Sequence, residues 1–131
     1  ARVYQAAHEA GLLTFLHSCG DITEILEDLI EIGLDVIQMD QQENMGMSRL
    51  GEQFGGRITF WCPVDIQATM VHGSLDDIRR SCCQLVNTLG RPAGGFIAKW
   101  YADPAGAGHR PAAIQAMCEE FIKLSREHRT V

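Results

Sequence analysis

Four short apolar runs, separated by stretches with helical periodicity, constrain the fold of this chain more than any other feature. The runs occupy residues 12–16, 36–39, 58–61 and 96–98. Each is too short for a helix, and each is too continuously apolar for a strand with one face in water. Such runs are typical of strands buried in a parallel sheet. The sequence therefore predicts an α/β fold, a parallel β/α repeat with four strands.

The stretches between these runs carry start and stop signals for helices. Asp21 followed by Glu24 resembles a capping box, and Gly33 occupies the position of a left-handed C-cap. Ser74 can cap a second helix, and Pro111 lies in the first turn of a third. The apolar stripes that these helices would bury are Ile22, Ile25, Leu26, Leu29 and Ile30, then Leu75, Ile78, Cys82, Leu85, Val86 and Leu89, then Ile114, Met117, Cys118, Phe121 and Ile122.

Two further helical stretches, at residues 3–10 and 47–54, complete the order α-β-α-β-α-β-α-β-α. This order builds either a doubly wound sheet or a (β/α)8 barrel of the TIM type. A doubly wound dinucleotide-binding fold has a glycine-rich turn after its first strand, whereas residues 17–20 contain one glycine. A complete barrel needs ~200 residues, so 131 residues supply about half of one. We expect a single partial domain over residues 1–131, whose open sheet edges need a missing N-terminal half or a second copy.

Composition and charge exclude two classes of partner. No apolar run approaches the ~18 residues that cross a membrane, so a membrane role is not expected. The formal net charge is -6, and an acidic surface repels phosphate backbones, which argues against nucleic-acid binding. Five cysteines form an odd set without the dense spacing of a secreted disulfide scaffold, so we expect reduced thiols and a cytoplasmic protein.

Side chains capable of chemistry follow each of the four predicted strands. The carboxyl ends of barrel strands converge on one mouth, where substrates bind. We therefore expect one site for a small-molecule substrate. The side chains concerned are His17 and Cys19 after the first run, Asp40 and Glu43 after the second, Cys62 and Asp65 after the third, and Lys99, Tyr101, Asp103 and His109 after the fourth.

The segment His17-Ser18-Cys19 indicates a pair of metal ligands. In extended backbone, residues i and i+2 point to the same side about 6.5 Å apart at Cα, so an imidazole and a thiolate can meet on one cation. Zinc accepts such mixed nitrogen and sulfur ligands. Cys62, at the end of the third run, is our candidate for a third ligand. The alternative is that His17 and Cys19 are ordinary residues at a strand end, because this spacing is short and common.

The remaining candidates have structural interpretations beside the chemical ones. Asp40 and Asp65 could be general acids or bases, could orient a ligand histidine, or could cap a following helix. Asp103 and His109 belong to residues 102–109, a segment rich in Gly, Pro and Ala that could close over a substrate or simply connect two elements. Three cysteines on or beside apolar helical stripes are interpreted as core residues, namely Cys82, Cys83 and Cys118.

Four segments, taken in order, resemble one protein family. Residues 17–22 read His-Ser-Cys-Gly-Asp-Ile and residues 33–36 read Gly-Leu-Asp-Val. Residues 60–65 read Phe-Trp-Cys-Pro-Val-Asp and residues 94–97 read Gly-Gly-Phe-Ile. Over nearly the whole chain they resemble the C-terminal half of the uroporphyrinogen decarboxylase superfamily. This resemblance implies a distorted (β/α)8 barrel, of which the chain covers about half.

The His-x-Cys pair resembles that of the zinc-dependent methyltransferases in this superfamily, which move a methyl group between a corrinoid protein and a thiol. The resemblance implies zinc on His17 and Cys19, a bound thiol that attacks as a thiolate, and a corrinoid protein as a partner. The methyltransferase pattern has its last cysteine after the final strand, but residues 99–108 contain none. Either Cys62 takes that place or zinc is lost.

Two other functions are compatible with the same resemblance. The decarboxylase branch implies metal-free decarboxylation of uroporphyrinogen in porphyrin biosynthesis, and its substrate-gripping arginines and aspartate belong to the other half of the barrel. Where that branch has a histidine after the last strand, this chain offers Tyr101, Asp103 and His109. The third possibility is a non-catalytic half that depends on a partner.

Overall fold

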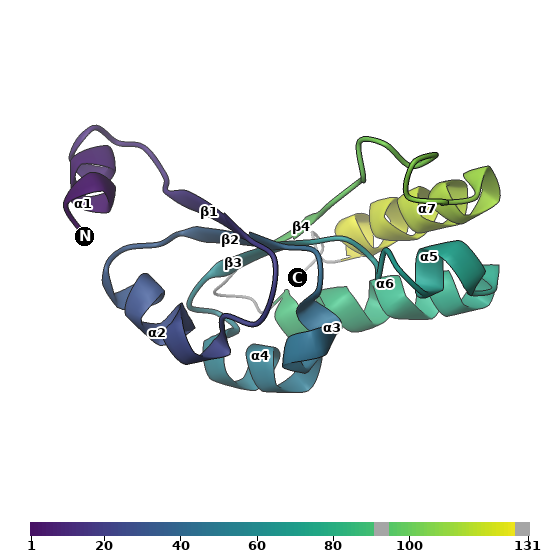
Figure 1. The fold of residues 1–131 in the computed structure, drawn as a ribbon, viewed down its shortest axis with the longest axis horizontal. Coiled ribbons are helices and arrows are strands. Elements are labelled where there is room, and N and C mark those ends of the chain that lie inside the picture. The colour runs from purple at the N-terminus through teal and green to yellow at the C-terminus, as the bar shows by residue number, and fades with distance from the viewer. Residues whose placement is uncertain (91–94, 128–131) are drawn as a thin grey trace.

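The computed structural model describes residues 1–90 and 95–127, which form one parallel sheet flanked by helices (Figure 1). The sheet has four strands, β1 (Phe15–Ser18), β2 (Val36–Met39), β3 (Thr59–Cys62) and β4 (Phe96–Ala98). They lie in the order β1-β2-β3-β4, and every neighbouring pair is parallel. The parallel β/α repeat with four strands that the sequence predicts is confirmed.

Seven helices occur within the described residues. They are α1 (Arg2–Glu9), α2 (Thr23–Glu31), α3 (Gln42–Met45), α4 (Met47–Phe54), α5 (Thr69–His72), α6 (Leu75–Leu89) and α7 (Pro111–Glu127). Figure 1 shows α2, α4 and α6 beneath the sheet, with α7 lying beside α6. The single-turn helices α3 and α5, which follow β2 and β3, were not predicted. Among these described helices, none has the length and apolar character that crossing a bilayer requires.

The strand order decides between the two architectures that the sequence allows. A doubly wound sheet reverses its strand order at a switch point, whereas a barrel adds its strands consecutively. The order here is consecutive throughout. The sheet is therefore that of four successive units of a (β/α)8 TIM-type barrel. Within the described residues, β1 and β4 each pair with only one neighbouring strand.

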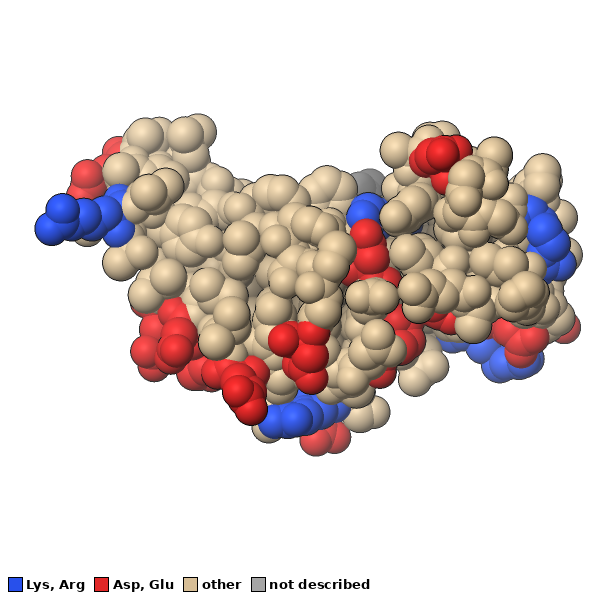
Figure 2. Space-filling view, in the orientation of Figure 1, with Lys and Arg blue, Asp and Glu red and all other residues tan. Residues whose placement is uncertain are grey.

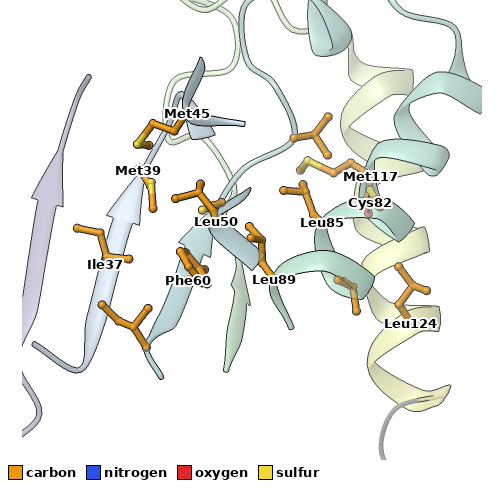
Figure 3. Packing of buried hydrophobic residues seen from close by; sticks show 14 of the residues in the cluster. Ile37, Met39, Met45, Leu50, Phe60, Cys82, Leu85, Leu89, Met117 and Leu124 are labelled. Carbon is orange, nitrogen blue, oxygen red and sulfur yellow. Dashed lines mark hydrogen bonds between the residues drawn. The ribbon is translucent and has the colours of Figure 1, made fainter. Parts of the chain in front are cut away.

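One face of the sheet carries the hydrophobic core. Phe60 pairs in register with Ile37 on one side and with Phe96 on the other, so these three side chains share a face. Ile37 and Phe60 are fully buried against the helices. Figure 3 shows Ile37, Phe60, Leu50 and Leu89 directed into one cluster. The helix layer thus covers this face at β2 and β3, while Phe96 in β4 is only half-buried.

The opposite face, which we call the open face, carries Phe15, Trp61 and Ile97. Phe15 is 51% exposed and Ile97 is 42% exposed. The rings of Phe15 and Trp61 lie 5.4 Å apart between centroids, so the two side chains point to the same side. In a closed barrel this face becomes the packed interior. The open face is therefore apolar surface that a complete barrel would bury.

The first strand begins later than predicted. Leu12 and Leu13 lie outside β1 and are 60% and 78% exposed. Thr14 connects the start of β1 to the start of β2, because its N–H and hydroxyl donate to Asp35 Oδ2 at 2.6 and 3.0 Å. His8 Nε2 lies 2.7 Å from the same oxygen. Helix α1 is thus held to the sheet by a polar contact, and none of its residues is buried.

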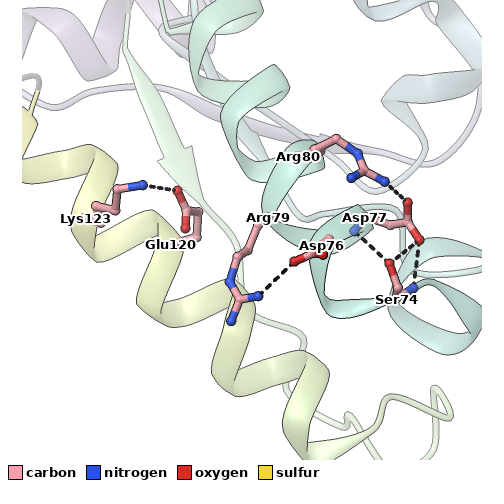
Figure 4. A network of polar contacts seen from close by, with 7 residues as sticks. All are labelled: Ser74, Asp76, Asp77, Arg79, Arg80, Glu120 and Lys123. Carbon is pink, nitrogen blue, oxygen red and sulfur yellow. Dashed lines mark hydrogen bonds and ion pairs between the residues drawn. The ribbon is translucent and has the colours of Figure 1, made fainter.

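The helix termini agree with the sequence in part. Gly33 has φ +96°, the left-handed conformation that its C-cap position predicts. Asp21 forms no capping box, because its carboxylate instead accepts from the N–H and hydroxyl of Thr23 at 2.9 and 2.6 Å. Ser74 does cap α6, in a reciprocal capping box with Asp77 (Figure 4). Both N-termini are therefore held by local hydrogen bonds, but only that of α6 has the predicted type of cap.

The buried face of α7 is rotated relative to the predicted stripe. Cys82 on α6 is buried as predicted, but Cys118 and Ile122 on α7 are exposed, and Cys83 is half-buried. Small side chains let α7 approach α6 closely, so alanines occupy positions that the hydrophobicity pattern assigns to larger residues. The buried residues of α7 are Ala113, Ala116, Met117, Glu120 and Leu124.

Candidate functional site

The site is built on the first two strands, where a histidine and a glutamine stand side by side. His17 in β1 pairs in register with Gln38 in β2, so both side chains leave the sheet on the same face. His17 Nδ1 is hydrogen-bonded to Gln38 Oε1. His17 is exposed, whereas Gln38 is only 4% exposed. The imidazole is therefore anchored at one nitrogen and accessible at the other.

Cys19 lies against the accessible nitrogen of His17. Its Sγ is 3.1 Å from His17 Nε2, and both side chains are exposed at the carboxyl end of β1. The two residues converge as their i, i+2 spacing suggests. We call them the His17–Cys19 pair. The pair offers one nitrogen and one sulfur donor to the mouth of the barrel.

A carboxylate and an ammonium group extend this arrangement across the sheet. Asp40 follows β2 and its Oδ1 accepts from Gln38 Nε2 at 2.6 Å. Lys99 follows β4 and its Nζ donates to the same oxygen at 2.6 Å. Asp40 is 8% exposed. His17, Gln38, Asp40 and Lys99 form a continuous chain of hydrogen bonds, which we call the polar row.

Tyr101 and His109 continue the site beyond Lys99. Lys99 Nζ lies 5.2 Å from the centre of the Tyr101 ring, a cation–π contact. The Tyr101 ring is 5.9 Å from that of His109. His109 is buried, with Nε2 within 3.0 Å of the carbonyl oxygen of Ile66. This contact joins the segment after β4 to the segment after β3, which favours the structural interpretation of His109.

Asp65 and Asp103 hold turns. The Asp65 carboxylate accepts from the backbone N–H groups of Gln67, Ala68 and Thr69 at 3.0, 3.1 and 2.9 Å, so it holds the turn that leads into α5. Partial burial raises the pKa of Asp65, but these hydrogen bonds, Thr69 first, hold it below its usual value. Asp103 is exposed and accepts from Gly106 N at 2.9 Å. Both contacts favour the structural alternative over acid–base chemistry.

Glu43 has an environment unlike that of the other carboxylates at the mouth. Its side chain remains exposed, yet enough protein surrounds the carboxylate that burial, together with the negative charge of Asp65, raises its pKa. The preceding residue, Gln42, is fully buried and donates to Glu43 Oε1 and to the Pro63 carbonyl at 2.9 and 2.7 Å. A raised pKa makes Glu43 a candidate proton carrier.

The structure does not bring Cys62 to the His17–Cys19 pair. Cys62 follows Phe60 by two residues in β3, so its side chain points into the core beneath the sheet, away from the open face. Burial, and then the charge of Glu43, raise the pKa of its thiol strongly. Within residues 1–90 and 95–127, no three His, Cys, Asp or Glu side chains are grouped so that they could hold a metal ion.

A pocket lies beside the polar row, between the segment after β3 and the segment after β4. Its volume is about 510 Å³, within the range of about 300–1,000 Å³ that small-molecule sites occupy. Tyr101 connects the two features, because it contacts Lys99 and also lines the pocket. The other lining residues are Ile66, Gln67, Val71, Asp103, Gly106 and Ala107.

Sequence reasoning missed Gln38. Its signal was present, because Gln38 is the only polar residue in the run at residues 36–39. A polar residue inside a buried strand needs hydrogen-bond partners. Gln38 finds them in His17 and Asp40.

Four consecutive parallel β/α units, with a cluster of polar side chains at the carboxyl ends of the strands, define the class of protein as a half of a TIM-type barrel with its site at the mouth. Residues 1–122 match the family model of uroporphyrinogen decarboxylase (URO-D). The chain therefore belongs to this family. No curated protein and no solved structure matches it. Of the segments that carry the resemblance, only Gly94 lies outside the described residues.

Proposed function

We propose that this chain is the zinc-binding half of a URO-D-family enzyme that transfers a methyl group to the sulfur of a thiol. The donor would be a corrinoid carried by a protein or a methylated small molecule. The observation that carries this proposal is the His17–Cys19 pair, whose Nε2 and Sγ atoms lie 3.1 Å apart at the mouth. Membership of the family supports an enzyme of this general kind.

The donor set of the pair suits zinc. Zinc binds imidazole nitrogen at about 2.0–2.1 Å and thiolate sulfur at about 2.3 Å, which at a tetrahedral angle separates the two donors by about 3.6 Å. The observed Nε2–Sγ separation is 0.5 Å shorter than this, so the two side chains would have to rotate slightly apart to bind the ion. Because no third His, Cys, Asp or Glu of the described residues joins the pair, a further ligand would be a side chain outside these residues or the substrate thiol.

The residues around the pair have distinct parts in the proposed reaction. When bound, zinc would lower the pKa of the substrate thiol, so that a thiolate is available at neutral pH. The thiolate sulfur forms a bond to the methyl carbon, the electron pair of the donor bond stays with the donor, and the thiol proton passes to solvent. Tyr101 and the pocket beside it would hold the small-molecule substrate.

The proposed enzyme needs a second half. The outer edges of β1 and β4 are unpaired among the described residues, and the open face leaves Phe15 and Ile97 exposed. A second set of four strands, from a further segment of a longer polypeptide or from a second copy, would pair with both edges and bury this face. The free cysteines support a reducing, cytoplasmic setting for the assembly.

Metal-free decarboxylation of uroporphyrinogen is less well supported. The cationic side chains that this reaction needs for the substrate carboxylates would belong to the other half of the barrel, and the cation that this half brings to the polar row, Lys99, is paired with Asp40. A non-catalytic half would give no reason for an exposed imidazole that is anchored at one nitrogen.

A methyl-transfer assay tests the proposal. The zinc-loaded protein, assembled with its second half, is incubated with methylcobalamin and a small thiol, and the loss of the cobalt–carbon bond is followed by absorbance while the methyl thioether is quantified. We expect turnover by the wild type, at least about 100-fold slower turnover by His17→Gln, and unchanged turnover by Cys118→Ser, whose thiol is exposed on α7. Equal rates for wild type and His17→Gln, or release of coproporphyrinogen from uroporphyrinogen without thioether formation, would contradict it.

A further inference from the structure

We propose that the polar row selects the tautomer of His17, with the proton on Nδ1 and the lone pair of Nε2 directed at Cys19. Gln38, Asp40 and Lys99 are then positioning residues for the His17–Cys19 pair. This inference rests on the proposed function for its purpose, but the tautomer itself is a property of the metal-free chain.

The direction of donation along the polar row is fixed because Lys99, at one end of the row, can only donate hydrogen bonds. The Lys99 ammonium has three donors and no acceptor, so Asp40 Oδ1 must accept from it. The same Oδ1 faces the Gln38 amide, so it accepts there as well. The amide group next to Asp40 is therefore the donating one, Gln38 Nε2, at 2.6 Å.

The orientation of the Gln38 amide then determines what His17 receives. An amide has its NH₂ on one side and its carbonyl oxygen on the other. With Nε2 committed to Asp40, the carbonyl oxygen Oε1 faces His17 Nδ1. The carbonyl oxygen of an amide can only accept a hydrogen bond. His17 Nδ1 therefore carries the hydrogen, and Nε2 of the neutral ring keeps its lone pair.

Burial makes this assignment stable. Gln38 is 4% exposed and the Asp40 side chain is 10% exposed, so water does not replace either partner. Turning the amide over would place its NH₂ against Nδ1–H and its oxygen against the Asp40 carboxylate, which breaks both contacts. The Nε2 lone pair facing Cys19 is the state in which histidine binds metals, with its other ring nitrogen donating to an oxygen.

The chain contains an internal reference for the experiment. His8 Nε2 lies 2.7 Å from Asp35 Oδ2, a carboxylate oxygen that also accepts from Thr14. An accepting carboxylate requires the hydrogen of His8 on Nε2, the opposite tautomer to that proposed for His17. The two histidines should therefore give opposite patterns in one spectrum.

Long-range ¹H–¹⁵N correlation spectra of the metal-free, ¹⁵N-labelled full chain, at a pH where imidazoles are neutral, test the proposal. We expect the Nδ1–H form for His17 and the Nε2–H form for His8. Gln38→Met removes the acceptor and should move His17 to the Nε2–H form that free histidine prefers, whereas Gln38→Glu restores an acceptor oxygen and should keep Nδ1–H. An Nε2–H form in the wild type, or an unchanged tautomer in a folded Gln38→Met, would overturn it.

Zinc titration separates this inference from the proposed function. Gln38→Met is expected to weaken zinc binding by about 10–100-fold, as loss of an outer hydrogen-bond partner does, and Gln38→Glu to restore it to within a few fold. Equal zinc affinity in wild type and Gln38→Met would overturn the positioning role. A wild type that binds no zinc contradicts the proposed function, while the spectra still decide the tautomer. The wild-type spectrum alone decides the tautomer of His17, even if the Gln38 variants fail to fold.

Discussion

Replacing Cys19 by Ser is expected to abolish stoichiometric zinc binding by this chain. A serine hydroxyl does not ionise at neutral pH, so zinc loses its thiolate ligand and retains only His17 of the pair. The affinity should fall by more than the roughly 10–100-fold that removal of an outer hydrogen-bond partner costs. Competition against a chromophoric chelator measures the change, with one zinc per wild-type chain as the reference.

Cys62→Ala is the matched variant for this experiment. The Cys62 thiol is fully buried in the core and its pKa is raised by burial, so it is not available as a thiolate on the open face. We expect Cys62→Ala to bind zinc within a few fold of the wild type. Loss of zinc from Cys62→Ala as complete as from Cys19→Ser would contradict the structure and restore the three-ligand set that the sequence suggests.

Phe60→Ala is expected to lower the free energy of unfolding by about 3–5 kcal/mol, as truncation of a fully buried phenylalanine does. Phe60 is completely inaccessible on the helix-covered face of β3. Phe15→Ala, on the open face, should cost only about 1 kcal/mol, mostly from its ring contact with Trp61. Urea denaturation of the isolated chain, followed by circular dichroism, measures both.

The comparison between the two phenylalanines tests the half-barrel architecture. Phe15 is 51% exposed because no second half covers it among the described residues. If Phe15→Ala destabilised the isolated chain as much as Phe60→Ala, the open face would have to be covered, for instance by a second copy. Coverage by a second copy would make the destabilisation depend on protein concentration. A decrease in the free energy of unfolding of that size at every protein concentration would therefore contradict an exposed open face.

The architecture was predictable because it depends on patterns that local sequence carries. Short apolar runs specify β2 and β4 at their observed bounds. The start of β1 was placed too early, since Leu12 and Leu13 are apolar yet exposed. Apolar residues that lie outside the sheet in this half are indistinguishable, in the sequence, from residues of a buried strand. The rotation of α7 was also hidden, because small alanines carry little hydrophobic signal.

The candidate site was predictable where two residues are close in sequence and not where they are distant. The convergence of His17 and Cys19 follows from the alternation of side chains along an extended segment. Cys62 comes from another strand, and its direction depends on which face of β3 the helices cover. The same alternation that pairs His17 with Cys19 groups Cys62 with buried Phe60, once that face is known.

The roles of Asp40 and Lys99 depend on a contact between residues 59 positions apart, which no local pattern contains. The sequence allows Asp40 three roles, namely acid–base chemistry, orientation of a ligand histidine, or capping of a following helix. Its bonds to Gln38 and Lys99 favour orientation, through Gln38 rather than directly. The contacts of Asp65 and Asp103 favour a different interpretation, the holding of local turns, because each carboxylate accepts from backbone N–H groups within four residues of itself.

Zinc-edge X-ray absorption of the loaded chain tests the central claim most directly, because it counts the atoms bound to the ion. The proposal predicts a single sulfur at about 2.3 Å together with nitrogen at about 2.0–2.1 Å, and loss of the sulfur shell in Cys19→Ser. A shell of nitrogen and oxygen alone in the wild type, with no sulfur, would contradict zinc binding by His17 and Cys19.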